Sequence, residues 1–423
     1  IYIVPSENHD LQVKGYIYRS RRGLPGAVKF YNPVSTQRLW DLNGFVQARY
    51  TATLSSLWRL QAVAKYTNGW NRDRETGPQF TGGVYQDTHR QQECYLSAST
   101  LFMPNSALTF ALAQDVAHAT LRSTVSDCPD PRRNTSVTAL TARWSKGVLT
   151  ARATATATYI SEHVSRGAVP SSFHRINPAA SISVRPFGSE AFFVRAMYKS
   201  TFRPPSFNDL YYERVGNRHL RPERADEFGA GLTWSRSLFP AMDYLSLTVD
   251  GYYNNVDDKI VALPTTYVWR TINFGKARVT GIDVTLATSV TLPKHIVLTL
   301  SGAYTWQRAI DLTDPLSKTY RHQLPYTPAH SGNVALTVST PWVEVGYSAV
   351  GVGRRYFLAQ NIPANEIPGY VDQTLTLSRE FAVRPFRIGV RAEINNLADE
   401  QYQVIKHYPM PGRAWRATAY LKF

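Results

Sequence analysis

The sequence predicts an all-β protein, an antiparallel transmembrane β-barrel, and three observations support this prediction. Apolar and polar residues alternate with period two in many stretches of the chain. Between these stretches, short turns alternate with long polar segments. No run of about 18 apolar residues, which a membrane-spanning helix needs, occurs in the 423 residues. Together these features are typical of strands that each turn one face to lipid.

The alternation is clear over residues 58–66, 245–254 and 386–395. In the first stretch Trp58, Leu60 and Tyr66 occupy even positions, whereas Arg59 and Lys65 occupy odd ones. A strand places such residues on opposite faces, but a helix would scatter the polar ones around its surface. Six residues are therefore expected to face lipid: Leu245, Leu247, Val249, Ile388, Val390 and Leu421.

The pattern gives roughly eighteen strands, all in one barrel domain over residues 1–423. They are expected near 10–20, 40–53, 57–68, 92–102, 106–117, 134–145, 148–160, 174–186, 190–203, 223–236, 242–256, 276–290, 294–306, 327–340, 342–354, 368–382, 384–397 and 413–423. Most exceed the 9–11 residues that cross a bilayer, so several are expected to extend above it. Residues 1–4 resemble the tail of an earlier strand. Because an open edge leaves backbone groups unpaired in lipid, further strands are expected outside this sequence.

The connections predict the orientation of the barrel. Pro104, Pro293, Pro341 and Pro385 lie in short turns, which such barrels place on the periplasmic rim. The longer polar segments are then extracellular loops. The last residue, Phe423, is expected on the periplasmic rim, and a C-terminal aromatic residue is what the barrel-assembly machinery reads in outer-membrane proteins.

Composition and motifs exclude several other classes. The net charge is +16, but Lys and Arg are spread along the chain without a basic helix or stripe, so no nucleic-acid partner is expected. On a barrel these cations would line the lumen and meet lipid phosphates, including those of lipopolysaccharide, at the rims. No nucleophile elbow, P-loop or complete dinucleotide fingerprint occurs, so neither an enzyme nor a cofactor is expected. No signal segment follows Ile1, which predicts a processed or truncated start.

Five motifs follow one another between residues 202 and 423. They are Phe202-Arg203-Pro204-Pro205-Ser206-Phe207-Asn208-Asp209-Leu210-Tyr211, Gly216-Asn217-Arg218-His219-Leu220-Arg221-Pro222-Glu223, Asn273-Phe274-Gly275-Lys276-Ala277 through Gly281 to Asp283, Leu324-Pro325-Tyr326-Thr327-Pro328, and Asn395-Asn396-Leu397-Ala398-Asp399 through Tyr402 and Pro411-Gly412-Arg413 to Phe423. In this order they resemble the motifs of TonB-dependent receptors. The departures are Pro204, where the family has Ala, and Arg218, where it has Pro.

This resemblance implies a 22-stranded barrel of the cell outer membrane, plugged by an N-terminal domain that contacts the TonB complex. Eighteen strands would lie in this chain. The plug and four strands would lie outside it, or a separate chain or surface lipoprotein would supply them. The implied function is uptake of a scarce nutrient complex: cobalamin, haem or a ferric siderophore. The modest loops resemble those of cobalamin and haem receptors. A passive porin and an adhesive surface barrel stay open as alternatives.

Three groups of loop residues are candidates for ligand binding. The first lies between Arg203 and Glu223, where three prolines fix the backbone. It is either a scaffold loop anchored by its charges or a ligand-binding loop. The second and third groups combine aromatic residues with cations or histidines. Aromatic rings suit apolar ligands, and arginine suits anionic ones. The candidates are Arg203, Tyr211, Tyr212, His219 and Arg221; Tyr267, Trp269 and Arg270; and His322, His407 and Tyr408.

Histidine and cysteine give two further expectations. The ten histidines show no zinc-ligand spacing, so no metal site is expected. Haem receptors of the resembling family carry a histidine between the first two motifs. Here the only nearby histidine is His219, inside the second motif, and it is either a candidate axial ligand or a solvated loop residue. Cys94 and Cys128 are both expected on the extracellular side, where a disulfide could form, or Cys94 is an unpaired strand residue.

Overall fold

The computed structural model describes residues 2–26, 35–78, 80–167, 172–188, 191–212, 216–264, 269–383 and 385–422. Tyr267, Phe423 and the side chain of Trp269, all selected from the sequence, lie outside the described part. The chain forms two compact units. Unit 1 contains residues 1–182, 197–226 and 258–273, and unit 2 contains residues 183–196, 227–257 and 274–423.

The eighteen predicted strands are confirmed, since each has a counterpart in the structure. They are β2 (His9–Gly23), β3 (Arg38–Thr53), β4 (Trp58–Thr76), β5 (Val84–Phe102), β6 (Leu108–Ser123), β7 (Arg132–Lys146), β8 (Leu149–His163), β9 (Phe173–Val184), β10 (Phe192–Arg203), β11 (Glu223–Arg236), β12 (Met242–Pro264), β13 (Trp269–Leu292), β14 (Ile296–Asp311), β15 (His330–Ser339), β16 (Glu344–Val352), β19 (Tyr370–Val383), β20 (Phe386–Asn395) and β23 (Ala414–Lys422). In the described residues these eighteen and the short β1 (Tyr2–Ser6) belong to one sheet.

The remaining elements are small and lie in the connections. They are the helix α1 (Phe207–Tyr211), the 3-10 turns η1 (Thr81–Gly83), η2 (Pro293–His295) and η3 (Pro363–Asn365), and the paired short strands β17 (Arg355–Tyr356) with β18 (Glu366–Ile367) and β21 (Gln403–Ile405) with β22 (Tyr408–Pro409). Among the described residues no helix is both long and apolar enough to cross a membrane.

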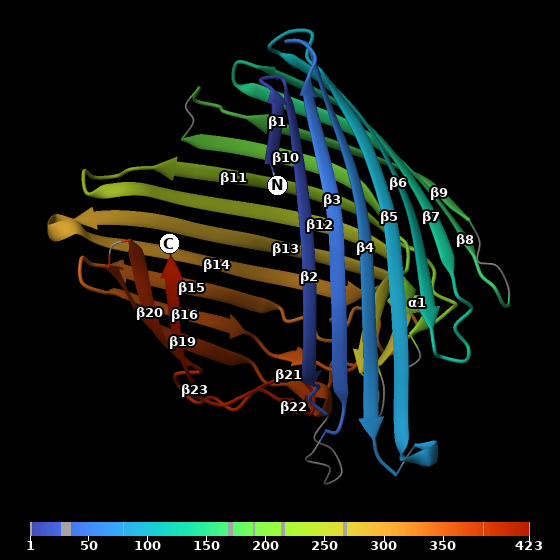
Figure 1. Ribbon diagram of the computed structural model, residues 1–423. Coiled ribbons are helices and arrows are strands. Elements are labelled where there is room, and N and C mark those ends of the chain that lie inside the picture. Colours follow the sequence, from blue (N-terminus) through green and yellow to red (C-terminus); the bar gives the residue numbers. More distant parts are fainter. Residues whose placement is uncertain are drawn as a thin grey trace. The chain divides into compact units, whose positions relative to one another are not determined.

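In unit 1 the strands from β1 to β8 each pair antiparallel with the next (Figure 1). The connections β3–β4, β5–β6 and β7–β8 are short and lie at one end of this ladder. Pro104 lies in the second of them. The longer connections β4–β5 and β6–β7 lie at the other end, so the predicted sorting of turns and loops is confirmed within this unit.

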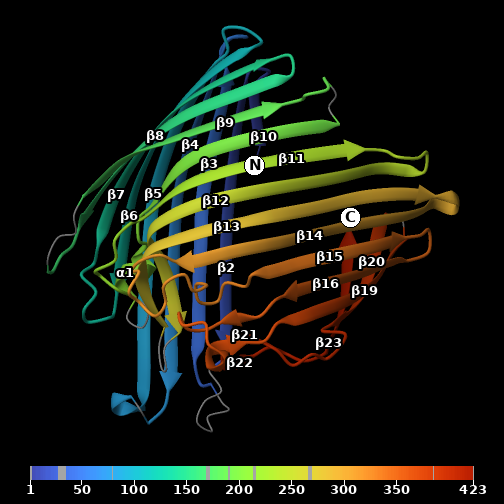
Figure 2. The same ribbon diagram turned by 180° about the vertical axis from the view of Figure 1, so that it is seen from behind.

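Unit 2 contains a second antiparallel ladder, which runs from β13 through β14, β15, β16, β19 and β20 to β23 (Figure 2). Pro293, Pro341 and Pro385 lie in the short connections at one end of it. Lys422 pairs with Arg387, next to one of these turns, so the described chain ends at the same end. The common rim predicted for these three prolines and the C-terminus is therefore confirmed within unit 2.

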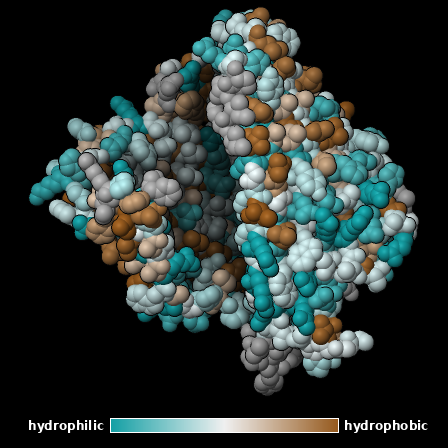
Figure 3. Space-filling model, in the orientation of Figure 1, coloured by the Kyte–Doolittle hydropathy of each residue, from teal (hydrophilic) through white to brown (hydrophobic). Residues whose placement is uncertain are grey.

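Each ladder has a polar face with ion pairs and an apolar face with exposed hydrophobic side chains. In β20 and β23, Ile388, Val390 and Leu421 are 39%, 47% and 55% exposed and lie on one face. On the other face Lys422 donates to Glu380 over 2.6 Å. Figure 3 shows the apolar face of β2 to β5, with hydrophobic residues gathered over the upper parts of the strands and hydrophilic ones more numerous below. The predicted face is therefore confirmed for Ile388, Val390 and Leu421, whereas for Leu245, Leu247 and Val249, which are half-buried in β12, it stays a prediction.

Candidate functional site

The connection between β10 and β11 contains the first two motifs, and a short helix organises its beginning. Pro204 and Pro205 fix an extended entry. Ser206 then caps α1: its hydroxyl accepts from the backbone N–H of Asp209 over 3.2 Å, and the Asp209 carboxylate accepts from the N–H of Ser206 over 2.9 Å. This reciprocal capping box satisfies two backbone donors, so a helix of only five residues is defined by its own sequence.

The connection packs on the polar face of unit 1 through a small apolar core. Nine buried residues form it: Ala119, Leu121, Val125, Cys128, Phe207, Leu210, Tyr211, Leu220 and Ile260. The first four come from β6 and the loop after it, and the next four from the connection itself. Burial of apolar side chains stabilises such contacts, so the connection is anchored to the sheet at both of its halves.

A buried ion pair with two extra donors holds the first half. Glu162 and Arg133 form a 2.6 Å salt bridge with side chains that are 5% and 14% exposed. Glu162 also accepts a hydrogen bond from the Tyr211 hydroxyl. Arg133 donates to the Pro205 carbonyl over 2.8 Å and lies 4.8 Å from the centre of the Phe207 ring. Burial, followed by the bond to Glu162, raises the pKa of Tyr211 above its usual value, so its phenol stays a proton donor.

Tyr212 anchors the next position of the connection. Its ring stacks on His89 of β5 with 3.9 Å between the ring centres, and its hydroxyl accepts from Asn71 of β4 over 3.2 Å. Burial raises the pKa of this phenol as well. The hydroxyls of Tyr211 and Tyr212 are thus both bonded to the sheet, which is the arrangement that the scaffold interpretation of this segment describes.

Four of the candidate side chains lie at the surface: one just before the connection, two in its second half and one in β13. Arg203, 54% exposed, lies 3.5 Å from Asp209 and 3.6 Å from Glu223, and so joins the two ends of the connection. Arg221, 67% exposed, pairs with Asp258 over 2.5 Å. The His219 side chain is exposed, and its backbone N–H donates to Asn217 over 3.0 Å. Arg270, near the start of β13, is also exposed. These four side chains are the first- and second-group candidates that solvent can reach.

The third group of candidates lies in unit 2 and is tied to its loops. His322 accepts at Nδ1 from the backbone N–H of Asn361 over 3.2 Å. His407 has a φ of 69° and its N–H donates to the Gln403 side chain over 2.8 Å. Tyr408 lies in β22, beside β21. His322, His407 and Tyr408 are all half-buried, so this group combines loop anchoring with partly accessible rings.

Sequence reasoning missed the residues that hold these loops. Arg355, 3% exposed, donates to the carbonyls of Gln403 and Val404 over 2.6 and 2.9 Å and fixes the β21–β22 hairpin. Arg355, like Arg133 and Glu162, lies in no recognisable sequence motif, because its partners lie far away in the chain. A charged residue at the loop end of a predicted strand is the only signal that could have pointed to them.

The disulfide that the sequence left open is not formed: both cysteines are free, in agreement with the alternative in which Cys94 is an unpaired strand residue. Cys94 lies within β5 and alternates onto the exposed apolar face, level with Tyr66 and His118. Cys128 is 1% exposed and belongs to the core on the polar face. A disulfide requires Cα atoms within about 7 Å and converging Cβ directions, which two sides of a sheet do not offer. Among the described residues no cluster of His, Cys, Asp or Glu could hold a metal ion.

The chain matches the family model of the TonB-dependent receptor-like β-barrel over residues 5–397. It belongs to this family. Relatives include the vitamin B12 transporters BtuB of Photobacterium profundum, 25% identical over 227 residues, and of Vibrio vulnificus, 25% identical over 233 residues. Each alignment covers 52% of this chain, and 34% and 33% of the respective relative. The chain therefore spans about a third of the length of these curated relatives.

Solved structures share the fold at low sequence identity. The copper transporter OprC matches with a TM-score of 0.77 and 11% identity, covering 100% of this chain and 71% of that one. The ferric citrate transporter FecA, unliganded, matches with 0.76 and 13%, covering 100% and 69%. The ferric preacinetobactin receptor BauA of Acinetobacter baumannii matches with 0.75 and 12%, covering 98% and 70%. At these identities the likeness establishes the barrel fold.

Proposed function

We propose that the protein containing this chain is an outer-membrane receptor that binds a scarce nutrient complex at its extracellular loops and imports it. The family match over residues 5–397 is the observation that carries this proposal. Import would be driven by the TonB complex acting on a plug, which another segment or a separate chain supplies. No bond of the ligand is made or broken, so the protein's task is recognition and passage.

The exposed side chains of the connection suggest the chemistry of the ligand. Arg203, His219, Arg221 and Arg270 offer hydrogen-bond donors that carry or can acquire positive charge. Such donors bind carboxylate, phosphate and catecholate oxygens well, and arginine does so in a bidentate fashion. Cobalamin, haem and ferric siderophores all carry acidic or anionic groups. We propose one of these three as the cargo, with BtuB relatives favouring a cobalamin.

A binding panel on the full-length protein tests this proposal. Cyanocobalamin, haemin, ferric citrate and a ferric catecholate would be titrated separately, and one of them should bind with a nanomolar dissociation constant, about −12 kcal/mol. His219→Ala should weaken that ligand about tenfold, as expected for one lost hydrogen bond. His163→Ala is the matched control, because His163 is exposed on the apolar face of β8. Absence of tight binding by all four, with free diffusion of small solutes, would favour the porin alternative.

A further inference from the structure

Four polar side chains form one row on the apolar face of unit 1. The registers pair Cys94 of β5 with Tyr66 of β4 on one side and with His118 of β6 on the other. His118 pairs in turn with Asn134 of β7. All four side chains are exposed. Directly opposite residues of antiparallel strands have Cβ atoms about 4.5–5.5 Å apart, so the thiol has a phenol as one neighbour and an imidazole as the other.

The imidazole of His118 is held in one tautomer. Its Nδ1–H donates to the side-chain oxygen of Asn134 over 2.7 Å, and an amide oxygen can only accept. Nδ1 therefore carries the proton, which leaves the lone pair on Nε2. A cysteine beside a histidine whose other nitrogen is oriented by an amide is an arrangement of a nucleophile, a general base and a positioning residue.

Tyr66 supplies a hydrogen-bond donor on the other side of the thiol. Its hydroxyl oxygen accepts from the side-chain amide of Gln92, which precedes Cys94 by two residues on the same face of β5. The O–H of Tyr66 is then left to donate. A donor beside a nucleophile stabilises the negative charge that develops on a carbonyl oxygen under attack. The row thus contains the groups that acyl transfer to a thiol requires.

The row lies near one edge of the apolar band. Phe102, eight residues after Cys94 on β5, stacks beside Trp58 and Phe110 in an aromatic cluster near the short turns, which marks the opposite edge. A rise of about 3.3 Å per residue and a tilt of about 40° put Cys94 roughly 20 Å from this cluster, in an apolar band about 25 Å tall. The ester groups of membrane lipids lie at the boundary between the hydrocarbon and headgroup regions, so they can meet the thiol at this depth.

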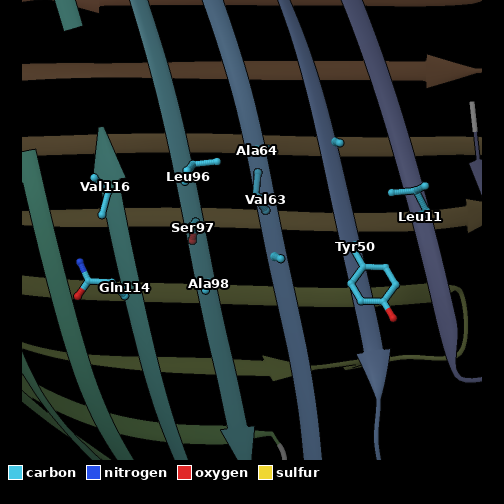
Figure 4. A pocket seen from close by; sticks show the side chains of 11 residues that line it. Leu11, Tyr50, Val63, Ala64, Leu96, Ser97, Ala98, Gln114 and Val116 are labelled. Atoms are coloured by element: carbon cyan, nitrogen blue, oxygen red, sulfur yellow. The ribbon is translucent and has the colours of Figure 1, made fainter. Parts of the chain in front are cut away.

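The apolar face is hollowed directly beside the row. A shallow depression of about 370 Å³ is lined by small side chains between larger ones (Figure 4). Its lining includes Ala64, Leu96 and Val116, which pair with one another across β4, β5 and β6 and form the row next to that of Cys94, on the side of the short turns. A hydrocarbon chain attached to the thiol would therefore have an apolar surface to lie on.

We propose that Cys94 takes an acyl chain from the ester of a membrane lipid and holds it as a thioester, a modification that goes beyond the transport function. The Sγ atom attacks the ester carbonyl carbon while its proton passes to Nε2 of His118, and the Tyr66 O–H donates to the carbonyl oxygen. The bond from the carbonyl carbon to the alcohol oxygen then breaks, and the proton on Nε2 passes to that oxygen. The products are S-acylated Cys94 and a lysolipid. The apolar surroundings exclude the water that would hydrolyse the thioester.

The test starts from full-length protein refolded in lipid-free detergent, in which Cys94 is a free thiol. Phosphatidylethanolamine with deuterated, ester-linked acyl chains is added, and the mass of the intact protein is followed. The mass should rise by one acyl chain, neutral hydroxylamine should remove that chain, and peptide mapping should place it on Cys94. The same lipid with ether-linked chains should give no gain, because it has no carbonyl carbon to attack. A parallel reaction with lipid A distinguishes the two ester sources of the outer membrane, and a gain from either one supports the proposal.

Variants assign the roles within the row, and each alters one exposed side chain, so the fold is kept. Cys94→Ala should abolish the gain. His118→Ala should slow it about a hundredfold or more, as expected for the loss of a general base, and Tyr66→Phe by a similar factor. Asn134→Ala should slow it about tenfold, as for one lost hydrogen bond, whereas Asn134→Asp, which keeps an acceptor for the Nδ1–H, should restore the rate.

His163→Ala and Tyr159→Phe are the matched controls, because both residues are exposed on the same face of β8 and lie outside the row. Both variants should be acylated at the wild-type rate. No gain with either ester lipid, an equal gain with the ether lipid, or an equal rate for His118→Ala and His163→Ala would overturn the proposal. A hydroxylamine-sensitive chain that still appears on Cys94→Ala would do the same.

Discussion

The buried Glu162 carboxylate is predicted to hold the β10–β11 connection on the sheet. Glu162→Ala leaves Arg133 buried without its 2.6 Å partner and Tyr211 without an acceptor. Breaking a buried pair in this way costs about 3–5 kcal/mol. The milder change Tyr211→Phe removes one hydrogen bond to a charged group, about 1.5–3 kcal/mol. Both substitutions should lower the free energy of local opening of the connection, because the strands of unit 1 keep their backbone pairing.

Amide hydrogen exchange over residues 207–212 of the folded full-length protein measures this local opening. Since about 1.4 kcal/mol corresponds to a factor of ten, Tyr211→Phe should accelerate exchange there by roughly 10- to 100-fold, and Glu162→Ala by more. Tyr212→Phe is the matched control, because it loses one neutral bond from Asn71, about 1 kcal/mol. If Tyr211→Phe opened the connection no more than Tyr212→Phe, or if the effects of Tyr211→Phe and Glu162→Ala simply added, the buried pair would not be the anchor.

Three further predictions concern single sites. A Cβ on Gly389 would collide with the ring of Tyr420, so Gly389→Ala should lower the free energy of unfolding by about 1–3 kcal/mol, seen as a lower unfolding temperature on gels. In a Tyr420→Ala background the Gly389→Ala substitution should cost less. Additive losses from the two substitutions would contradict the collision. Maleimide should label the exposed Cys94 of the folded protein before Cys128, which is buried and whose pKa is raised by burial. It should label both after denaturation without reductant; no label under those conditions would mean a disulfide between them. The pKa of the Tyr211 phenol is raised, so this phenol should ionise at a higher pH than exposed tyrosines, which ionise near pH 10. Its contribution to stability is therefore complete below pH 10 and is lost as the pH rises above that value. An ultraviolet titration in which Tyr211→Phe removes a phenol that titrates together with the exposed ones would contradict this prediction.

The fold could be predicted from the sequence because its determinants are local. Strand alternation has a period of two, and turns carry Pro, Gly or Asn, so both features are visible within ten residues. The boundaries were less accurate where strands extend above the apolar band. β5 begins at Val84, eight residues before the expected start. Its first residues include Tyr85, Asp87 and His89, and both faces are polar there, so the alternation that marks a strand disappears.

The site was less predictable, because its contacts join distant parts of the chain. The motif residues of the β10–β11 connection could be selected, but not the direction of their side chains. Tyr211 meets Glu162 from 49 residues away, and Arg133 meets Pro205 from 72 residues away. The sequence could not decide whether the two cysteines pair, for a related reason: it placed Cys94 at a strand end, whereas the longer β5 places it on the opposite face of the sheet from Cys128.

Energy-dependent uptake is the measurement that tests the central proposal most directly. Cells that produce the full-length protein would be given the radiolabelled ligand found in the binding panel, with and without a functional TonB complex. We expect saturable accumulation against a gradient that stops when TonB is removed and persists in an otherwise identical strain that has it. Uptake that rises linearly with concentration and is the same without TonB would contradict a receptor function and indicate a passive channel.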